Sequence, residues 1–258
     1  MPWVIKSNFR NMSSMILPDK KDAIHKAWLY RVLQSLADEP YLAGCLYFKG
    51  GTCASMLGWL DRFSVDLDFD YAGEEKDVKK TKILLEKIFA ELGLTIKDGS
   101  KNGIQYFLKY ENDGRGRRIL KLDASFPLFH ASKYKPERFL EIDRILNCQT
   151  KETMFAHKLV ALRDRFNRTG GIAGRDIYDI HHFFMNGWKY DTEVIIERTD
   201  KEPKEFLKEL VGFIETKVSK KHIDEDLNPL LPAGKFALAR KVLKGETISL
   251  IKDEIRRL

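Results

Sequence analysis

Residues 46–71, LYFKGGTCASMLGWLDRFSVDLDFDY, decide the fold of this chain. LYFKGG (46–51) predicts a short buried strand that stops at two glycines, and ASMLGWL (54–60) predicts a helix that ends near Gly58. Along RFSVDLDFDY (62–71), apolar residues alternate with carboxylates, as on a strand that has one buried and one polar face. The residues on the polar face are Asp66, Asp68 and Asp70.

Helical and strand patterns continue on both sides of this stretch. Before residue 150, helical spacing covers 20–38 and 76–93, and two strands, 104–111 and 118–126, flank the turn NDGRGR as a hairpin. After about residue 150 only helices are predicted, over 151–166, 174–187, 202–218, 232–243 and 248–258. The expected fold class is α/β (α+β), a core with a small mixed sheet and flanking helices followed by an all-helical C-terminal half. The expected domains are 1–150 and 151–258.

Composition narrows the classes of protein and of partner. The 258 residues are 43% hydrophobic and 32% charged, which is ordinary for a globular protein with a buried core. No apolar run approaches the roughly 18 to 20 residues that span a bilayer, the N-terminus has no long apolar stretch, and three cysteines are scattered. We therefore expect a cytoplasmic protein without a membrane partner. The net charge of +7 suits a polyanionic partner, but equally a basic protein that is merely soluble.

The segment from Gly50 to Asp68 has the residues of a metal and phosphate site. Asp66 and Asp68 face the same side of a strand, roughly 6.5 to 7 Å apart along the backbone. Magnesium commonly takes one or two carboxylates together with substrate phosphates. Gly50 and Gly51 let the backbone approach a phosphate, with the Thr52 hydroxyl beside it. Separately, an acidic triplet is usually a solvated strand face and two glycines are usually a turn.

Four motifs in order resemble the nucleotidyltransferase-like toxins of the AbiEii/AbiGii group, within the DNA polymerase β-like superfamily. The first is a glycine turn followed by RxTxDxD, here Gly50, Gly51, Arg62, Ser64, Asp66 and Asp68. Serine replaces threonine, and a second glycine replaces the usual serine. The second is IxxxD, here Ile119 and Asp123; the third is KxxAxxxR, here Lys158, Ala161 and Arg165; the fourth is DxxD, here Asp176 and Asp179.

The resemblance implies a role for each motif residue. Catalytic roles fall to Asp66, Asp68, Asp123, Lys158 and Asp176. Magnesium, with manganese as an alternative, would be held by Asp66, Asp68 and Asp123. The NTP would be bound by Gly50, Gly51, Thr52, Arg62, Ser64, Lys158, Arg165 and Asp179.

The residues themselves support part of this assignment. Asp123 alternates with Lys121 on a strand and could accept the proton of an acceptor hydroxyl. Lys158 and Arg165 are seven residues apart, so they share a helix face that suits the β- and γ-phosphates. The DxxD pair could orient these cations, contact the sugar or base, or be a structural salt-bridge pair. Asp70 could tune the field of the site or be a solvated strand residue, and Lys49 has no assigned role.

The predicted function is transfer of NMP from an NTP to an acceptor, with release of pyrophosphate. The favoured acceptor is RNA, at the tRNA 3′ end, because relatives in the group modify tRNA and the hairpin turn carries basic residues. These are Arg115, Arg117 and Arg118. The resemblance also implies a toxin of a toxin–antitoxin or phage-defence pair, with an antitoxin partner. The alternatives are a transferase of the same fold that acts on a protein hydroxyl or small molecule, and a catalytically inactive binding or regulatory protein.

Overall fold

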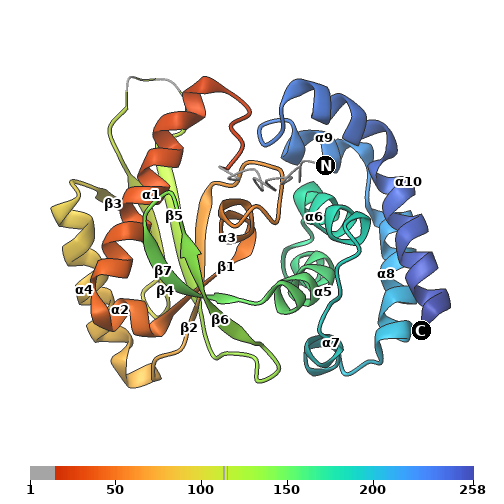
Figure 1. Ribbon diagram of the computed structural model, residues 1–258, viewed down its shortest axis with the longest axis horizontal. Helices are drawn as coiled ribbons and strands as arrows, with labels where there is room; N and C mark the ends of the chain where they lie inside the picture. Colours follow the sequence, from red (N-terminus) through yellow and green to blue (C-terminus); the bar gives the residue numbers. More distant parts are fainter. Residues whose placement is uncertain (1–14, 113, 115) are drawn as a thin grey trace, which may run out of the picture.

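A mixed sheet forms the N-terminal part of the chain in the computed structural model, which describes residues 15–112, 114 and 116–258 (Figure 1). The described residues form seven strands in the order β3-β4-β5-β2-β1-β7-β6. The strands are β1 (Leu46–Lys49), β2 (Asp66–Tyr71), β3 (Thr95–Gly99), β4 (Ile104–Lys109), β5 (Ile119–Ser125), β6 (Tyr134–Phe139) and β7 (Arg144–Gln149). The pairs β2–β5 and β1–β7 are parallel, and the other neighbours are antiparallel.

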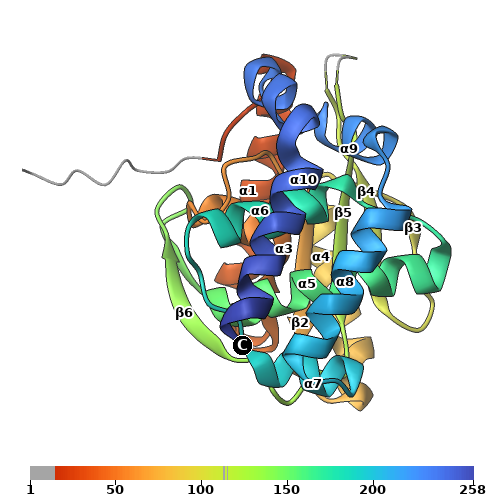
Figure 2. The ribbon, with the colours of Figure 1, turned by 90° about the vertical axis from the view of Figure 1, so that its right-hand side faces the viewer.

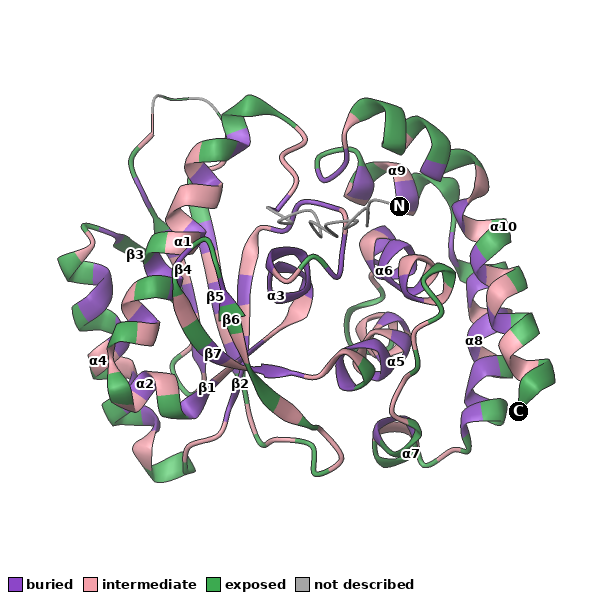
Figure 3. Ribbon diagram, in the orientation of Figure 1, coloured by how far each residue is buried: buried purple, intermediate pink, exposed green. Residues whose placement is uncertain are grey.

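Helices cover both faces of this sheet. In Figure 1, α1 and α4 lie to the left of the strands, while α3 and the C-terminal helices lie to the right. The helices of the first half are α1 (Ala23–Asp38), α2 (Pro40–Cys45), α3 (Gly50–Met56) and α4 (Val78–Glu91), with short 3-10 turns at Lys20–Asp22 and Glu75–Asp77. Figure 3 shows buried residues along the strands and on the helix faces that pack against them. At the centre, the ring centroid of Phe48 lies 5.2 Å from that of Phe69 and 5.7 Å from that of Phe139.

Everything described after β7 is helical or irregular. The helices are α5 (Lys151–Thr169), α6 (Gly174–Met185), α7 (Thr192–Thr199), α8 (Pro203–Lys217), α9 (Lys220–Leu227) and α10 (Ala233–Arg257). Figure 2 looks onto this side of the molecule, with α8 and α10 in the foreground. No helix within the described residues is both long and apolar enough to cross a membrane. The predicted fold class, a mixed sheet with flanking helices followed by helices alone, is confirmed.

The sheet is larger than the sequence predicts because three strands lack a clear alternation. All five residues of β3 are exposed, and β6 contains a proline between charged residues. Three helices, α2, α7 and α9, were also not predicted. Conversely, the predicted helices 232–243 and 248–258 are one continuous helix, α10. Its middle is held by packing, since Thr247 is fully buried and the Lys244 ammonium binds two carbonyl oxygens at the end of α8.

Element boundaries near the glycines also differ from the prediction. β2 begins only at Asp66, because the preceding residues bond outside the sheet. The Phe63 N–H donates to the Leu230 carbonyl at 2.9 Å, and His25 Nε2 donates to the Val65 carbonyl at 2.8 Å. The predicted helix 54–60 is α3, which already begins at Gly50. The strand therefore starts at the first carboxylate of the acidic triplet.

Asp70 joins five of the strands. Its Oδ1 accepts from Lys49 Nζ of β1 at 2.6 Å and from Ser125 Oγ of β5 at 3.1 Å. Its Oδ2 accepts from Tyr134 OH of β6 at 2.8 Å and from Gln149 Nε2 of β7 at 2.6 Å. Burial alone would raise the pKa of Asp70, but Lys49 and these hydrogen bonds outweigh burial and lower it. Asp70 is therefore a structural residue of the sheet rather than a solvated one.

The variant Asp70→Asn should lower the free energy of unfolding by about 1–3 kcal/mol at neutral pH, because an amide cannot accept all four bonds. The folded pKa of Asp70 is lowered, so its stabilisation is present above the ordinary aspartate value of about 3.9. That stabilisation is lost as the pH falls through the folded pKa, and the two proteins should then converge. Urea titrations across this range measure the effect, with Asp143→Asn at an exposed ion pair as control. An equal loss in both variants would contradict the assignment.

Candidate active site

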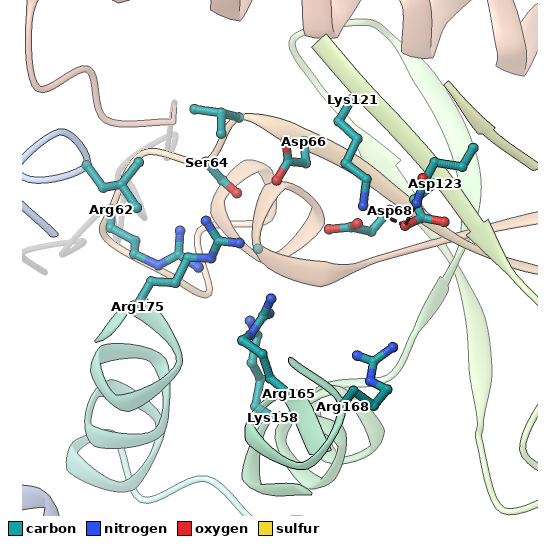
Figure 4. A pocket seen from close by; sticks show the side chains of 14 residues that line it. Arg62, Ser64, Asp66, Asp68, Lys121, Asp123, Lys158, Arg165, Arg168 and Arg175 are labelled. Atoms are coloured by element: carbon teal, nitrogen blue, oxygen red, sulfur yellow. Dashed lines mark hydrogen bonds and ion pairs between the residues drawn. The ribbon is translucent and has the colours of Figure 1, made fainter. Parts of the chain in front are cut away.

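A cavity of about 340 Å³ lies between the strands β2 and β5 and the helices α5 and α6. Its charged lining is divided into two walls that face each other in Figure 4. The carboxylates Asp66, Asp68 and Asp123 lie on the strand side. The cations Lys158, Arg165, Arg168 and Arg175 lie on the helix side, and one cation, Lys121, lies among the carboxylates on the strand side. Such a cavity can take a polyanion along one wall and a cation along the other.

The parallel pairing of β2 with β5 brings the strand carboxylates together. Asp68 lies directly opposite Asp123, and neighbouring strands are about 4.7–4.9 Å apart. Burial, and then the charge of Asp66, raise the pKa of Asp68. Within the described part of the chain, neither Asp66 nor Asp68 forms a side-chain hydrogen bond or an ion pair. These two carboxylates repel each other, and the positive charges of Lys49, Lys121 and Lys158 offset this repulsion only in part, since the pKa of Asp68 is still raised.

Asp123 is held differently from the other two carboxylates. Its Oδ2 accepts from Lys121 Nζ at 2.6 Å and from Gln105 Nε2 at 3.0 Å. Among the described residues, no three Asp, Glu, His or Cys side chains converge closely enough to hold a metal ion by themselves. The unpartnered pair Asp66 and Asp68 nevertheless fits magnesium, which takes one or two carboxylates and completes its shell with substrate oxygens and water.

The glycine turn packs tightly behind the acidic wall. Gly50 has φ +78°, and a Cβ there would lie 2.6 Å from Asp68 Oδ2, so only glycine fits. A Cβ on Gly51 would lie 2.7 Å from Arg62 Nη2 and 2.8 Å from Ser64 Oγ. Gly51 and Ser64 line the cavity. Thr52 does not: it is fully buried, and its hydroxyl donates to the Asp66 carbonyl.

A buried ionic cluster lies behind the basic wall. Arg62 donates from Nε and Nη2 to the two oxygens of Asp179, at 2.5 and 2.7 Å, and both side chains are almost fully buried. Lys158 Nζ lies 2.9 Å from Asp176 Oδ1 and 3.0 Å from Asp179 Oδ2. Arg165 Nη2 lies 3.5 Å from Asp176. We call Arg62, Lys158, Asp176 and Asp179 the ionic cluster.

The charges of the cluster stabilise one another against burial. Burial alone would lower the pKa of Lys158, but Asp176 and Asp179 outweigh it and raise the pKa. Burial alone would likewise lower the pKa of Arg62, and Asp179 reverses this. The pKa of Asp176 is lowered because Lys158 and Arg165 outweigh its burial. Arg62, Lys158 and Asp176 are therefore charged at neutral pH.

The DxxD aspartates lie behind the cations rather than on the cavity wall. Asp176 and Asp179 have no exposed surface and do not line the cavity, although Lys158 and Arg165 do. Of the alternatives left open by the sequence, the geometry matches ion pairing that orients Lys158. Arg62 reaches the cavity lining, but its guanidinium is used by Asp179 and by the Phe63 carbonyl.

Four polar lining residues were not predicted as part of the site. They are Gln105, Lys121, Arg168 and Arg175. Two of them follow a signal in the sequence, because Lys121 precedes Asp123 by two on the same strand face and Arg168 follows Arg165 by three on a helix. Gln105 is set by the β4–β5 register and Arg175 by the packing of α6, neither of which the sequence predicted. The lining is completed by Val65 and Leu230.

Solved structures share this fold. The structure of JHP933 from Helicobacter pylori aligns with a TM-score of 0.50 and 18% identity, over 93% of this chain and 96% of that chain. A second H. pylori structure, described as that of a candidate nucleotidyltransferase, has the same TM-score and identity. Its alignment covers 91% of this chain and 98% of that chain. At this identity the likeness shows the fold alone. Comparison with curated proteins finds no match.

The family is shown by the sequence itself. Residues 31–242 match the family described as "Nucleotidyl transferase AbiEii toxin, Type IV TA system", and this range includes all four motifs. By class, the protein is a nucleotidyltransferase. It belongs to the AbiEii nucleotidyl transferase toxin family of type IV toxin–antitoxin systems. The resemblance predicted from the sequence is confirmed.

Removal of Asp179 should destabilise the protein strongly, because it leaves Arg62 and Lys158 buried with too little opposite charge. We expect Asp179→Ala to cost about 3–5 kcal/mol in the free energy of unfolding. The matched control is Asp224→Ala, which breaks an exposed pair with Arg240 and should cost less than about 1 kcal/mol. Denaturant unfolding measures both, and similar values for the two variants would refute a structural role for the cluster.

Proposed function

We propose that this chain transfers a nucleoside monophosphate from an NTP to the 3′ end of an RNA, most readily a tRNA, and releases pyrophosphate. The observation that carries the proposal is the division of one cavity into a carboxylate wall and a cationic wall. In a member of the AbiEii family, this division suits a metal-bound triphosphate. Through this reaction the protein would act as the toxin of a toxin–antitoxin pair. It would act in the cytoplasm, where NTPs and RNA occur.

The cationic wall would bind the triphosphate. Lys158 is fixed by its two aspartates with its ammonium at the cavity, so it is positioned before the nucleotide arrives. Arg168 and Arg175 line the cavity and form no hydrogen bond or ion pair with any described side chain. Guanidinium groups match phosphate oxygens in pairs, so these two arginines would supply the free positive charge, and Arg165, which lies 3.5 Å from Asp176, would add to it. Gly51 and Ser64, which lie beside Arg62 in the cavity lining, would border the phosphates.

The acidic wall would hold magnesium, or manganese in its place. Asp66 and Asp68 are the ligands that the proposal assigns, with Asp123 as the third. When bound, the metal would neutralise the charge that develops on the phosphate oxygens. Asp123 Oδ2 is held by Lys121 and Gln105, so its Oδ1 is the oxygen left to act.

The reaction needs little covalent chemistry from the protein. The acceptor hydroxyl oxygen forms a bond to the α-phosphorus, and the bond from that phosphorus to the bridging oxygen breaks. Pyrophosphate leaves with the bonding electrons, and Asp123 takes the hydroxyl proton. Lys158 and Arg165 stabilise the negative charge on the leaving group. Most of the rate enhancement would therefore come from positioning and charge neutralisation.

Charge favours RNA as the acceptor. The net charge is +7, and the hairpin that carries Asp123 has basic residues at its turn. Arg118 is exposed, Arg117 lies 3.6 Å from Asp22, and Arg115 lies outside the described residues. Phosphate contacts by such residues release counterions, so RNA affinity should fall steeply as salt rises. A protein hydroxyl or a small molecule remains the alternative acceptor.

Incubation of the protein with each α-labelled NTP, magnesium and separate pools of RNA and protein tests the proposal. We expect label in RNA that RNase removes and protease does not. Asp66→Ala and Asp68→Ala should abolish labelling while the protein stays folded, because each removes a metal ligand without opening a core cavity. Magnesium at about 100 times its Kd should raise the free energy of unfolding of the wild type by about 2.7 kcal/mol. It should not raise that of either variant.

Two results would count against the proposal. Label that resists RNase and disappears with protease would assign the transfer to a protein acceptor. Near-normal turnover of either aspartate variant would remove the metal assignment. Thermal melts with and without magnesium separate loss of metal binding from loss of folding.

The variant Arg175→Gln should weaken NTP binding without destabilising the fold, because Arg175 forms no hydrogen bond or ion pair with another described side chain. Loss of a charge-assisted hydrogen bond costs about 1.5–3 kcal/mol, which is about 10- to 150-fold in affinity. Calorimetry measures this, with Arg256→Gln on exposed α10 as control. Arg175 is a cleaner probe than Lys158, whose loss would also leave Asp176 and Asp179 unpaired. Unchanged NTP affinity would exclude Arg175 from the site.

A further inference from the structure

The open face of the sheet continues from the cavity across β5 onto β4. Asp66 lies opposite Lys121, and Lys121 lies opposite Phe107 on β4. Two residues closer to the hairpin turn, and on the same face, Lys109 lies opposite Ile119. Directly opposed residues on neighbouring strands share a face, so these side chains extend the acidic wall outward. We call Phe107, Lys109, Ile119 and Lys121 the β4–β5 shelf.

The apolar residues of the shelf have no packing role that explains them. Phe107 is half-buried, lies outside the hydrophobic core, and forms no ring contact with any described aromatic or histidine ring. Its neighbours on the opposite face, Tyr106 and Leu108, are buried, and Tyr106 packs its ring 5.2 Å from that of Phe89. Ile119 is 41% exposed. The shelf therefore presents an aromatic ring and an aliphatic side chain beside the catalytic carboxylates.

The charges around the shelf favour a polyanion. Lys109 is exposed on the shelf, Lys121 borders the cavity, and Arg168 faces the strand side of that cavity from α5. Asp98 on β3 lies opposite Phe107 and brings a negative charge to the sheet edge, which limits the favourable surface to β4 and β5. An aromatic ring between lysines is the combination with which proteins bind single-stranded nucleic acid, since bases stack on the ring and phosphates contact the cations.

We propose that the β4–β5 shelf binds the 3′-terminal nucleotides of the RNA acceptor, with a base stacked on Phe107. This inference rests on the proposed function, because it takes RNA as the acceptor. Phe107 on β4 pairs with Lys121 on β5. Asp123 is two residues further along β5, roughly 6.5–7 Å from Lys121 along the backbone. A base on Phe107 thus leaves its ribose hydroxyls near Asp123. Lys109 then contacts the backbone phosphate on the side of the hairpin turn.

The test compares RNA affinity, without NTP or catalysis, among three substitutions of Phe107. Phe107→Ala and Phe107→Leu should weaken binding of a single-stranded RNA about 5- to 150-fold, as expected for loss of one stacked base. Phe107→Tyr should keep the affinity, because it keeps the aromatic face. NTP affinity should be unchanged in all three, and the KM for RNA should rise more than kcat falls. Phe129→Ala, at another exposed aromatic residue, is the matched control.

A charge comparison tests the lysine of the shelf. Lys109→Gln should weaken RNA binding and reduce its dependence on salt, because one phosphate contact is lost. Lys79→Gln, at an exposed lysine on α4 behind the sheet, should change neither. An RNA whose last base is 5-iodouracil should cross-link on irradiation to the peptide that contains Phe107.

The outcomes separate the shelf from the proposed function. Equal RNA affinity of Phe107→Ala and wild type, or a cross-link elsewhere, would overturn the shelf and leave RNA transfer intact. If the wild type neither binds nor labels RNA, both the proposed function and the assignment of RNA to the shelf would be overturned. Label on a protein acceptor that depends on Phe107 would assign the shelf to a peptide, and would also overturn the inference.

Discussion

The bidentate ion pair between Arg62 and Asp179 is the interaction on which the rest of the site depends. Arg62 lies just before β2, and Asp179 lies on α6, 117 residues later in the chain. Both side chains are almost completely buried, so neither can move without leaving an unpaired charge inside the protein. The pair fixes the distance between the strand that carries Asp66 and Asp68 and the helices that carry the cations.

The same pair also determines the position of Lys158. Asp179 Oδ2 accepts from Arg62 and lies 3.0 Å from Lys158 Nζ, while Asp176 holds the ammonium from the other side. Lys158 is thereby placed at the cavity by partners on α6 rather than by its own helix. On the opposite wall, the Asp70 network joins five strands two residues further along β2 than Asp68. Each wall is thus adjoined by buried charges that are paired with one another.

The sequence predicted the residues whose position follows from periodicity. The alternation in RFSVDLDFDY places Asp66 and Asp68 on one strand face, and the seven-residue spacing places Lys158 and Arg165 on one helix face. It could not predict that Asp70, on the same strand face, would be used by the sheet, because two of its partners, Tyr134 and Gln149, come from strands without clear alternation. Arg175 enters the lining because α6 packs its first residue against α9 so closely that only glycine fits. Such contacts depend on tertiary packing and leave no periodic signal.

Charge balance explains why the site needs arginines beyond the four motifs. The ionic cluster contains two cations and two carboxylates, so its net charge is zero. Lys158 therefore contributes a precisely oriented hydrogen-bond donor, but little excess positive charge. The excess comes from Arg165, Arg168 and Arg175 in the cavity lining, of which Arg168 and Arg175 form no ion pair with a described carboxylate. A buried cluster that is neutral keeps the fold stable in the absence of nucleotide, while the unpaired arginines are free to bind a polyanion. The division between paired charges behind the wall and unpaired charges on it is what allows one cavity to be both stable and reactive.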